Sequence, residues 1–168
     1  TSGELVIGSD VVIDGDVSGD GGAPEIALDG NGASRVIRIA CGSSTLDGLV
    51  MTGGKTFGFS GQGGGVFVAS GATVAIVDSV ISGNTNGGIS NSGTLALTNA
   101  TVSDNDASAF GGGINNRGTL TLNETTVSGN SIGDYGGGGG IANSGTATLT
   151  DTTVSGNSCG YQSRGGGI

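Results

Sequence analysis

The chain has 168 residues, of which 39 are glycine, one is proline and 4% are aromatic, a composition unlike that of an ordinary packed globule. Its five basic and fourteen acidic residues argue against binding to nucleic acid or to an anionic membrane, both of which require clustered lysine and arginine, and no apolar run approaches the roughly 18 residues of a membrane-spanning helix. A disordered glycine-rich linker is also disfavoured, because the apolar residues, 34% of the chain, recur in register.

Near the start of the chain, apolar and polar residues alternate in two stretches, ELVIGSDVVIDGD at 4–16 and EIALDGNGASRVIRIA at 25–40. A period of two is typical of β-strands, so residues 1–35 are predicted to form irregular opening coils of a repeat that becomes regular over residues 36–168. We expect residues 1–168 to form one segment. Because the last four residues, GGGI, begin another copy of the repeat, we expect a longer protein whose export signal and anchor lie elsewhere.

From the end of the first stretch to the start of the second, residues 14–25 read DGDVSGDGGAPE and resemble a calcium-binding loop in their spacing. Calcium takes several oxygen ligands from a loop that turns at a glycine, and Gly19 stands at the sixth position. The predicted ligands are Asp14, Asp16, Ser18, Asp20 and Glu25. No flanking helices are readable, and an acidic, glycine-rich connection between two strands would look the same without a metal.

The repeat is marked by one aliphatic residue after each glycine run. These residues are Val66, Ile89, Ile114, Ile141 and Ile168, at steps of 23, 25, 27 and 27 residues. Steps of this size are typical of solenoid proteins. Within a copy, apolar residues alternate with small polar ones, as in TLTL at 119–122, and the many glycine and β-branched residues disfavour helix.

Aligning the copies gives two further aliphatic columns. The first contains Leu46, Ile76, Leu97, Leu122 and Leu149, and the second contains Met51, Ile81, Val102, Val127 and Val154. Three columns predict three strands per coil that share one interior, with like residues stacked at about 4.8 Å. The sequence therefore predicts an all-β fold, a right-handed parallel β-helix of about six coils.

Two columns of asparagine keep the same register. Asn84, Asn105, Asn130 and Asn157 end the third strand, and Asn91, Asn116 and Asn143 follow the glycine run. Stacked amides can hydrogen-bond along the axis as a structural ladder. Alternatively, each asparagine suits only its own turn, through a local side-chain bond or a left-handed backbone.

Loops of variable length lie between the Asn84–Asn157 column and the next glycine run, so we expect them on one corner of the solenoid. They hold five of the six aromatic residues, Phe57, Phe59, Phe110, Tyr135 and Tyr161, together with Lys55 and Arg164. Loops on a rigid scaffold commonly carry binding, and aromatic faces suit sugars or protein partners. The alternative is that these rings fold back and cover the flank of the solenoid.

Catalytic chemistry is poorly represented. The chain has no histidine, and the acidic residues that align, Asp78, Glu124 and Asp151, share a strand-end position with Asn99 and Gly48, as expected of a solvated turn. We therefore predict no catalytic residues and no required cofactor, with calcium as the one ion to consider. Outward threonines, Thr119, Thr121, Thr146 and Thr148 among them, could order water as ice-binding solenoids do, but threonine also simply suits exposed strands.

The two cysteines allow a geometric expectation. Cys41 falls near the second coil and Cys159 near the sixth, which separates them by roughly 15–20 Å along the axis. Bonded cysteines require Cα atoms within about 7 Å. We predict no disulfide between them.

The phrases GGGI at 111–114, GGGGGI at 136–141, TVSGN at 126–130 and 153–157, and STLDGLVMTGG at 44–54 resemble those of bacterial secreted and surface right-handed β-helix proteins. Chlamydial polymorphic outer-membrane proteins carry a similar GGA-I repeat, although their second motif has phenylalanine where this chain has valine. The resemblance implies an extracellular or cell-surface β-solenoid with a structural or adhesive role.

From the residues and this resemblance we expect a non-enzymatic rod or fibre that presents its loop-bearing corner for contact. The expected partners are other copies stacked end to end, other surface proteins, or a glycan. A carbohydrate-active β-helix, either polysaccharide-binding or lyase-like, and an ice-binding solenoid are the alternatives.

Overall fold

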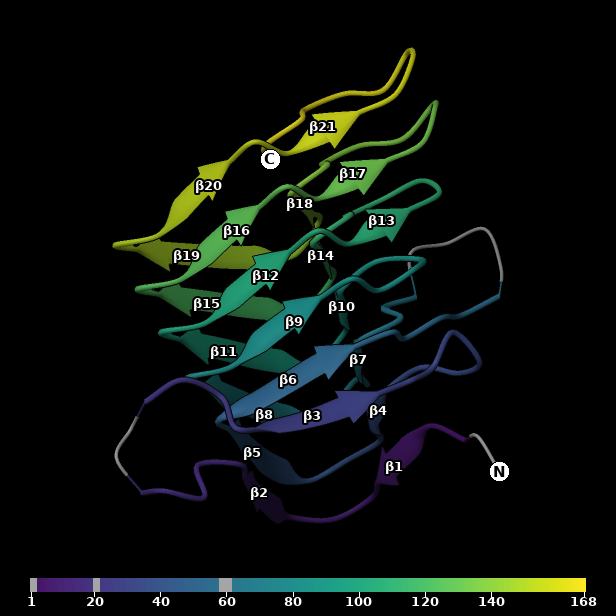
Figure 1. The fold of residues 1–168 in the computed structure, drawn as a ribbon. Helices are drawn as coiled ribbons and strands as arrows, with labels where there is room; N and C mark the ends of the chain where they lie inside the picture. The colour runs from purple at the N-terminus through teal and green to yellow at the C-terminus, as the bar shows by residue number, and fades with distance from the viewer. Residues whose placement is uncertain (1–2, 20–21, 58–61) are drawn as a thin grey trace.

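The computed structural model describes residues 3–19, 22–57 and 62–168. The chain winds into a parallel β-solenoid, and the described residues contain no helix of any kind. In Figure 1 the chain crosses the near side from left to right, returns on the far side from right to left and climbs with each pass, which is a right-handed winding. Within those residues no helix is long and apolar enough to cross a bilayer.

Three long parallel sheets form the three sides of the solenoid, and each contains one strand from every coil. Sheet A contains β1 (Leu5–Ile7), β4 (Ile37–Ile39), β7 (Val66–Val68), β10 (Ile89–Asn91), β14 (Ile114–Asn116) and β18 (Ile141–Asn143). Sheet B contains β2 (Val11–Asp14), β5 (Ser43–Asp47), β8 (Thr73–Val77), β11 (Thr94–Thr98), β15 (Thr119–Asn123) and β19 (Thr146–Thr150). Sheet C contains β3 (Ile26–Asp29), β6 (Leu49–Thr52), β9 (Val80–Ser82), β12 (Thr101–Ser103), β16 (Thr126–Ser128) and β20 (Thr153–Ser155). The described chain therefore makes six passes around one axis.

The strand register confirms the columns predicted from the repeat. Leu46 pairs with Ile76, Ile76 with Leu97, Leu97 with Leu122 and Leu122 with Leu149. The column from Met51 to Val154 and the column from Val66 to Ile141 stack in the same way. The opening stretches also form strands, because β1, β2 and β3 make the first coil.

One continuous aliphatic core fills the interior. Leu97 and Leu122 are fully buried, whereas Leu149 in the sixth coil keeps the register but is 38% exposed, since only one neighbouring coil covers it. Alternation places the intervening residues on the outside, as in β11, where Leu95 and Leu97 are buried and Thr94 and Thr98 are exposed. The period of two in the sequence is thus the period of the strands.

A short fourth sheet was not expected. Sheet D contains β13 (Asp106–Ala107), β17 (Ser131–Ile132) and β21 (Ser158–Cys159), which follow the asparagine column in coils four to six. Inward-facing Ala107 and Ile132 are buried. Sheet D begins the variable loops, which project one above another at the right of Figure 1.

The asparagine column from Asn84 to Asn157 forms a hydrogen-bonded ladder. The side-chain amide of Asn84 donates to Oδ1 of Asn105 at 2.9 Å, that of Asn105 to Asn130 at 3.0 Å, and that of Asn130 to Asn157 at 2.9 Å. Each Oδ1 also accepts from the backbone N–H of the asparagine one coil earlier. The second column behaves alike, with Asn91 donating to Asn116 and Asn116 to Asn143.

In the third to sixth coils, the glycine that directly precedes the sheet A strand makes room for this ladder. A Cβ atom added at Gly88 would lie 2.8 Å from Nδ2 of Asn105, and one at Gly113 would lie 2.9 Å from Nδ2 of Asn130. Real side chains do not approach so closely. The GGGI phrase and the asparagine column are therefore two halves of one packing arrangement.

Candidate functional site: the loop edge and the groove beside it

The loops that follow sheet C line one edge of the solenoid, which we call the loop edge: residues 55–57, 106–110, 131–137 and 158–164. Three of its aromatic rings stand open to solvent, with Phe57 76% exposed, Tyr135 70% and Tyr161 69%, and Phe110 is 44% exposed. The backbone N–H of Tyr135 donates to the carbonyl of Tyr161 at 3.1 Å, so the two tyrosines stand on adjacent coils. Phe59 lies outside the described residues.

Each long loop returns to sheet A through a residue in the left-handed region, such as Gly111 (φ 59°) and Gly138 (φ 67°). Just before this bend, Phe110, Gly137 and Arg164 pair with one another as a column of parallel bridges across coils four to six. Gly137 therefore leaves a space between an aromatic ring and an arginine on the outer side of sheet A.

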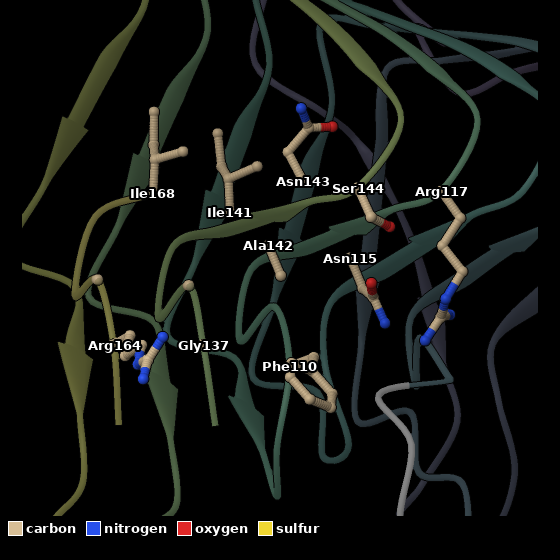
Figure 2. Close-up of a pocket in the computed structure, with 12 residues that line it drawn as sticks. Phe110, Asn115, Arg117, Gly137, Ile141, Ala142, Asn143, Ser144, Arg164 and Ile168 are labelled. Atoms are coloured by element: carbon tan, nitrogen blue, oxygen red, sulfur yellow. The ribbon is translucent and has the colours of Figure 1, made fainter. Parts of the chain in front are cut away.

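That space is part of an open groove of about 510 Å³. Its lining residues come from the returning loops, from β14 and β18, and from the turns that follow sheet A: Phe110, Asn115, Arg117, Gly137, Gly138, Ile141, Ala142, Asn143, Ser144, Arg164, Gly165 and Ile168. Figure 2 shows the Phe110 ring between Arg164 and Arg117, with the Asn115 amide on the same side. The groove thus combines an aromatic face, polar amides and a hydroxyl with two cations.

The charge of the groove contrasts with that of the chain. The net charge of the protein is −9, yet the groove contains two of its five basic residues and no acidic residue among its lining residues. Neither Arg117 nor Arg164 makes a side-chain hydrogen bond, an ion pair or a ring contact with any residue that the structure describes.

The other three cations are engaged elsewhere. Arg35 forms an ion pair with Glu4 at 2.9 Å and donates through Nε to the carbonyl of Gly63. Burial lowers the pKa of Arg35, and the Glu4 carboxylate opposes that effect. The Arg38 and Lys55 side chains lie over the rings of Phe67 and Phe57, 5.8 and 5.6 Å from the ring centroids. The unpaired cations are therefore both in the groove.

The groove is suited to holding an anion and lacks the groups that acid–base catalysis uses. A guanidinium presents a planar fork of N–H donors that matches a carboxylate. The lining residues supply no carboxylate, thiol or imidazole that could act as a general acid or base. This arrangement can bind and orient a ligand.

The sequence pointed to part of this site. Phe110 and Arg164 were expected at the variable corner, whereas Arg117 was overlooked. Arg117 occupies a turn position that is serine in the two neighbouring coils, Ser92 and Ser144. At all three positions the backbone N–H donates to a backbone carbonyl of the preceding coil, which for Arg117 is that of Asn91. An arginine that interrupts a column of serines was the signal available in the sequence.

The proposed calcium loop is the connection between β2 and β3. Its acidic side chains accept hydrogen bonds from the loop itself: Asp14 from the N–H of Asp16, Asp16 from Ser18 and Gly19, and Glu25 from the N–H of Ser18. Asp20 lies outside the described residues, and among the described ones no three potential ligands gather. Calcium binding at residues 14–25 stays a prediction.

The aligned acidic residues occupy a left-handed turn between sheets B and C, as expected. Gly48, Asp78, Asn99, Glu124 and Asp151 all have φ values between 46° and 60°. Beside this turn, burial raises the pKa of Asp47, and the negative charges of Asp78 and Asp14 raise it further. The column is a stack of turn residues, of which Asn99, Glu124 and Asp151 are exposed, Asp78 is partly exposed and Gly48 is buried.

The outward face of sheet B carries the threonines. Thr73, Thr94, Thr119 and Thr146 form one unbroken column, but Ala75 and Ala96 interrupt the next column before Thr121 and Thr148. Ice binding by this face stays a prediction.

Both cysteines are free thiols. Cys41 follows β4 in the second coil and donates to the carbonyl of Gly8, whereas Cys159 lies in β21 of the sixth coil. Four coil steps, about 19 Å, separate these two coils.

Comparison with known proteins gives no assignment, since no family model, no curated protein and no solved structure matches this chain.

Proposed function

We propose that the protein is a non-enzymatic, adhesive and structural β-solenoid that acts outside the cell or at its surface and presents the loop edge as its contact face. One observation carries this proposal: Phe57, Tyr135 and Tyr161 remain 69–76% exposed on loops that a stacked, hydrogen-bonded scaffold holds in position. Large rings exposed on a rigid scaffold are typical of contact surfaces.

The supporting features concern mechanics and setting. The asparagine ladders and the continuous core make a stiff body, and the repeat phrases resemble those of bacterial surface and secreted β-helix proteins. Such a body holds the exposed loops at fixed positions without changing its own shape. Other copies stacked end to end, other surface proteins and glycans are the partners that this proposal admits.

The test is binding of the purified protein to a glycan array and to a panel of cultured cells. Tyr135→Ala combined with Tyr161→Ala is expected to reduce binding by about tenfold or more, because aromatic contacts commonly dominate such surfaces. The control is Thr121→Ala combined with Thr148→Ala, which changes two exposed residues of adjacent coils on sheet B and is expected to bind like the unaltered protein. Equal binding by both double variants would remove the loop edge as the contact face.

A further inference from the structure

We propose that the groove beside the loop edge binds a carboxylate-bearing oligosaccharide, with Arg117 and Arg164 holding its carboxylates and Phe110 contacting a sugar ring. This groove is a second site, distinct from the exposed tyrosines, and its ligand class is new. The inference rests on the proposed function only in that both take the protein to bind a partner. The groove and the tyrosine tips are different residues, so their roles are tested separately.

The first step is the charge of the groove. Arg117 and Arg164 are exposed and have no charged partner among the residues that the structure describes, in a chain with a net charge of −9. The three other cations are each paired with a carboxylate or lie over an aromatic ring. Two uncompensated guanidinium groups lining one groove favour an anionic occupant.

The second step is the shape and polarity between the cations. Gly137 carries no side chain, so the 510 Å³ groove stays open between Phe110 and Arg164. The Phe110 ring is 44% exposed, which leaves it able to pack against an apolar sugar face. Ser144 is exposed at the same groove and supplies a hydroxyl for ligand hydroxyl groups.

The third step distinguishes the saccharide from an acidic peptide. Both would satisfy the arginines, but a run of acidic residues offers Phe110 only flexible side chains, whereas every uronate ring presents an apolar C–H face that can pack on the aromatic ring. The row from Phe110 to Gly137 to Arg164 also runs along the solenoid axis across three successive coils. A chain of rings with regularly spaced carboxylates fits this row of contacts, so the saccharide is the occupant to which we commit.

Gly137 provides a substitution that fills the groove without disturbing the backbone. Its φ is not in the left-handed region, and a Cβ atom there would meet Cδ1 of Phe110 at 3.9 Å and the carbonyl of Arg164 at 3.7 Å, which are ordinary contacts. Gly137→Ala should therefore fold and leave the groove open, whereas Gly137→Leu should fold and occupy the space beside the Phe110 ring.

The experiment measures binding of hexagalacturonate to the full chain by titration calorimetry. Arg117→Gln and Arg164→Gln are each expected to weaken binding about three- to fivefold, and Gly137→Leu to weaken it at least as much. Arg38→Gln, which removes one exposed cation outside the groove, and Gly137→Ala are the matched controls and are expected to bind normally. Affinity should fall as salt is raised from about 0.05 to 0.5 M.

Two ligand controls complete the design. The methyl ester of hexagalacturonate keeps the rings but lacks the charge, and hexaglutamate keeps the charge but lacks the rings, so both should bind several-fold more weakly. The proposal is overturned if hexagalacturonate does not bind, if Arg38→Gln weakens binding as much as Arg117→Gln, or if hexaglutamate binds equally well. The Tyr135→Ala, Tyr161→Ala double variant separates the two proposals. If this variant still binds the oligosaccharide and still adheres to cells, the groove proposal stands and the tyrosine contact face is rejected.

Discussion

From the third coil to the sixth, single buried amide groups link each coil of the solenoid to the next. Asn105 is 1% exposed, and its Oδ1 accepts from both the backbone and the side chain of Asn84 while its Nδ2 donates to Asn130 and to the carbonyl of Ile81. Every polar atom of this buried side chain is therefore satisfied. Removing such a group leaves buried donors and acceptors unpaired, which costs more than the bonds themselves contribute.

Asn105→Ala is accordingly expected to lower the free energy of unfolding by about 2–4 kcal/mol. The measurement is equilibrium unfolding in urea. Asn123→Ala, which makes the same chemical change in the next coil on an outward position of β15, is the control and should change stability by no more than about 0.5 kcal/mol. A similar loss in both variants would show that the ladder adds nothing beyond an ordinary surface asparagine.

Much of this residue-level picture could be predicted from the sequence. The asparagine columns were visible because each repeats at the same distance from a strand, and stacked coils bring equivalent residues together. The groove was not visible, since it depends on Arg117 from one turn and Arg164 from a loop two coils away in height. No sequence period links those two positions, and only the three-dimensional path of the returning loops brings them to one surface.

The strands differ in how clearly the sequence pattern predicts them. The five-residue strands of sheet B, such as β11 and β15, alternate over their whole length and were predicted with their correct facing. The strands of sheet D have two residues each, too few to show alternation. They form because the ladder of Asn105, Asn130 and Asn157 fixes the position of the chain immediately before them. Chains held in register at these asparagines then pair over the next two residues.

At the end of strand β5, Asp47 supplies a pH prediction. Its half-buried carboxyl group stacks on Asp14 of β2, and burial, followed by the charges of Asp78 and Asp14, raises its pKa in the folded state. At pH values between the ordinary pKa and the raised one, the folded protein therefore binds more protons than the unfolded chain. The free energy of unfolding consequently rises as the pH falls through that window. At neutral pH its charge is destabilising.

Asp47→Asn is expected to raise the free energy of unfolding at pH 7 by about 0.5 kcal/mol, with the gain disappearing below the ordinary carboxyl pKa, near pH 3.5. Thermal unfolding of both proteins from pH 3.5 to 7 measures this. Thr98→Asn introduces the same amide at the equivalent strand position two coils later and removes no charge; it is the comparison and should show no change with pH. A stabilisation of equal size at both ends of the pH range would mean that the Asp47 charge is not its cause.

Across the whole molecule, each coil contacts mainly the coil before it and the coil after it. Leu97 stacks directly on Leu122, whereas Ile76 and Leu97 lie between Leu46 and Leu122. The spacing of about 4.8 Å per coil puts Leu46 and Leu122 about 14 Å apart. Energetic coupling should therefore decay within about two coils, as it does in other linear repeats.

A double-mutant cycle tests this decay. Leu97→Val and Leu122→Val should each cost about 1–2 kcal/mol and should couple by at least about 0.5 kcal/mol, because they share one packing contact. Leu46→Val with Leu122→Val should be additive within about 0.5 kcal/mol. Urea unfolding of the unaltered protein, the three single variants and the two double variants measures both coupling energies, and strong coupling over three coil steps would contradict the nearest-neighbour picture.

The asparagine ladders have an electrical consequence, because all their side-chain bonds run in one sense. In both columns the amide N–H points toward the later coil and the oxygen toward the earlier one. Two head-to-tail rows of amides make a permanent dipole whose positive pole faces the sixth coil. Arg117 and Arg164 lie in the half of the molecule nearest this positive pole. An approaching anion is therefore attracted by the aligned amides of the scaffold as well as by the two side chains.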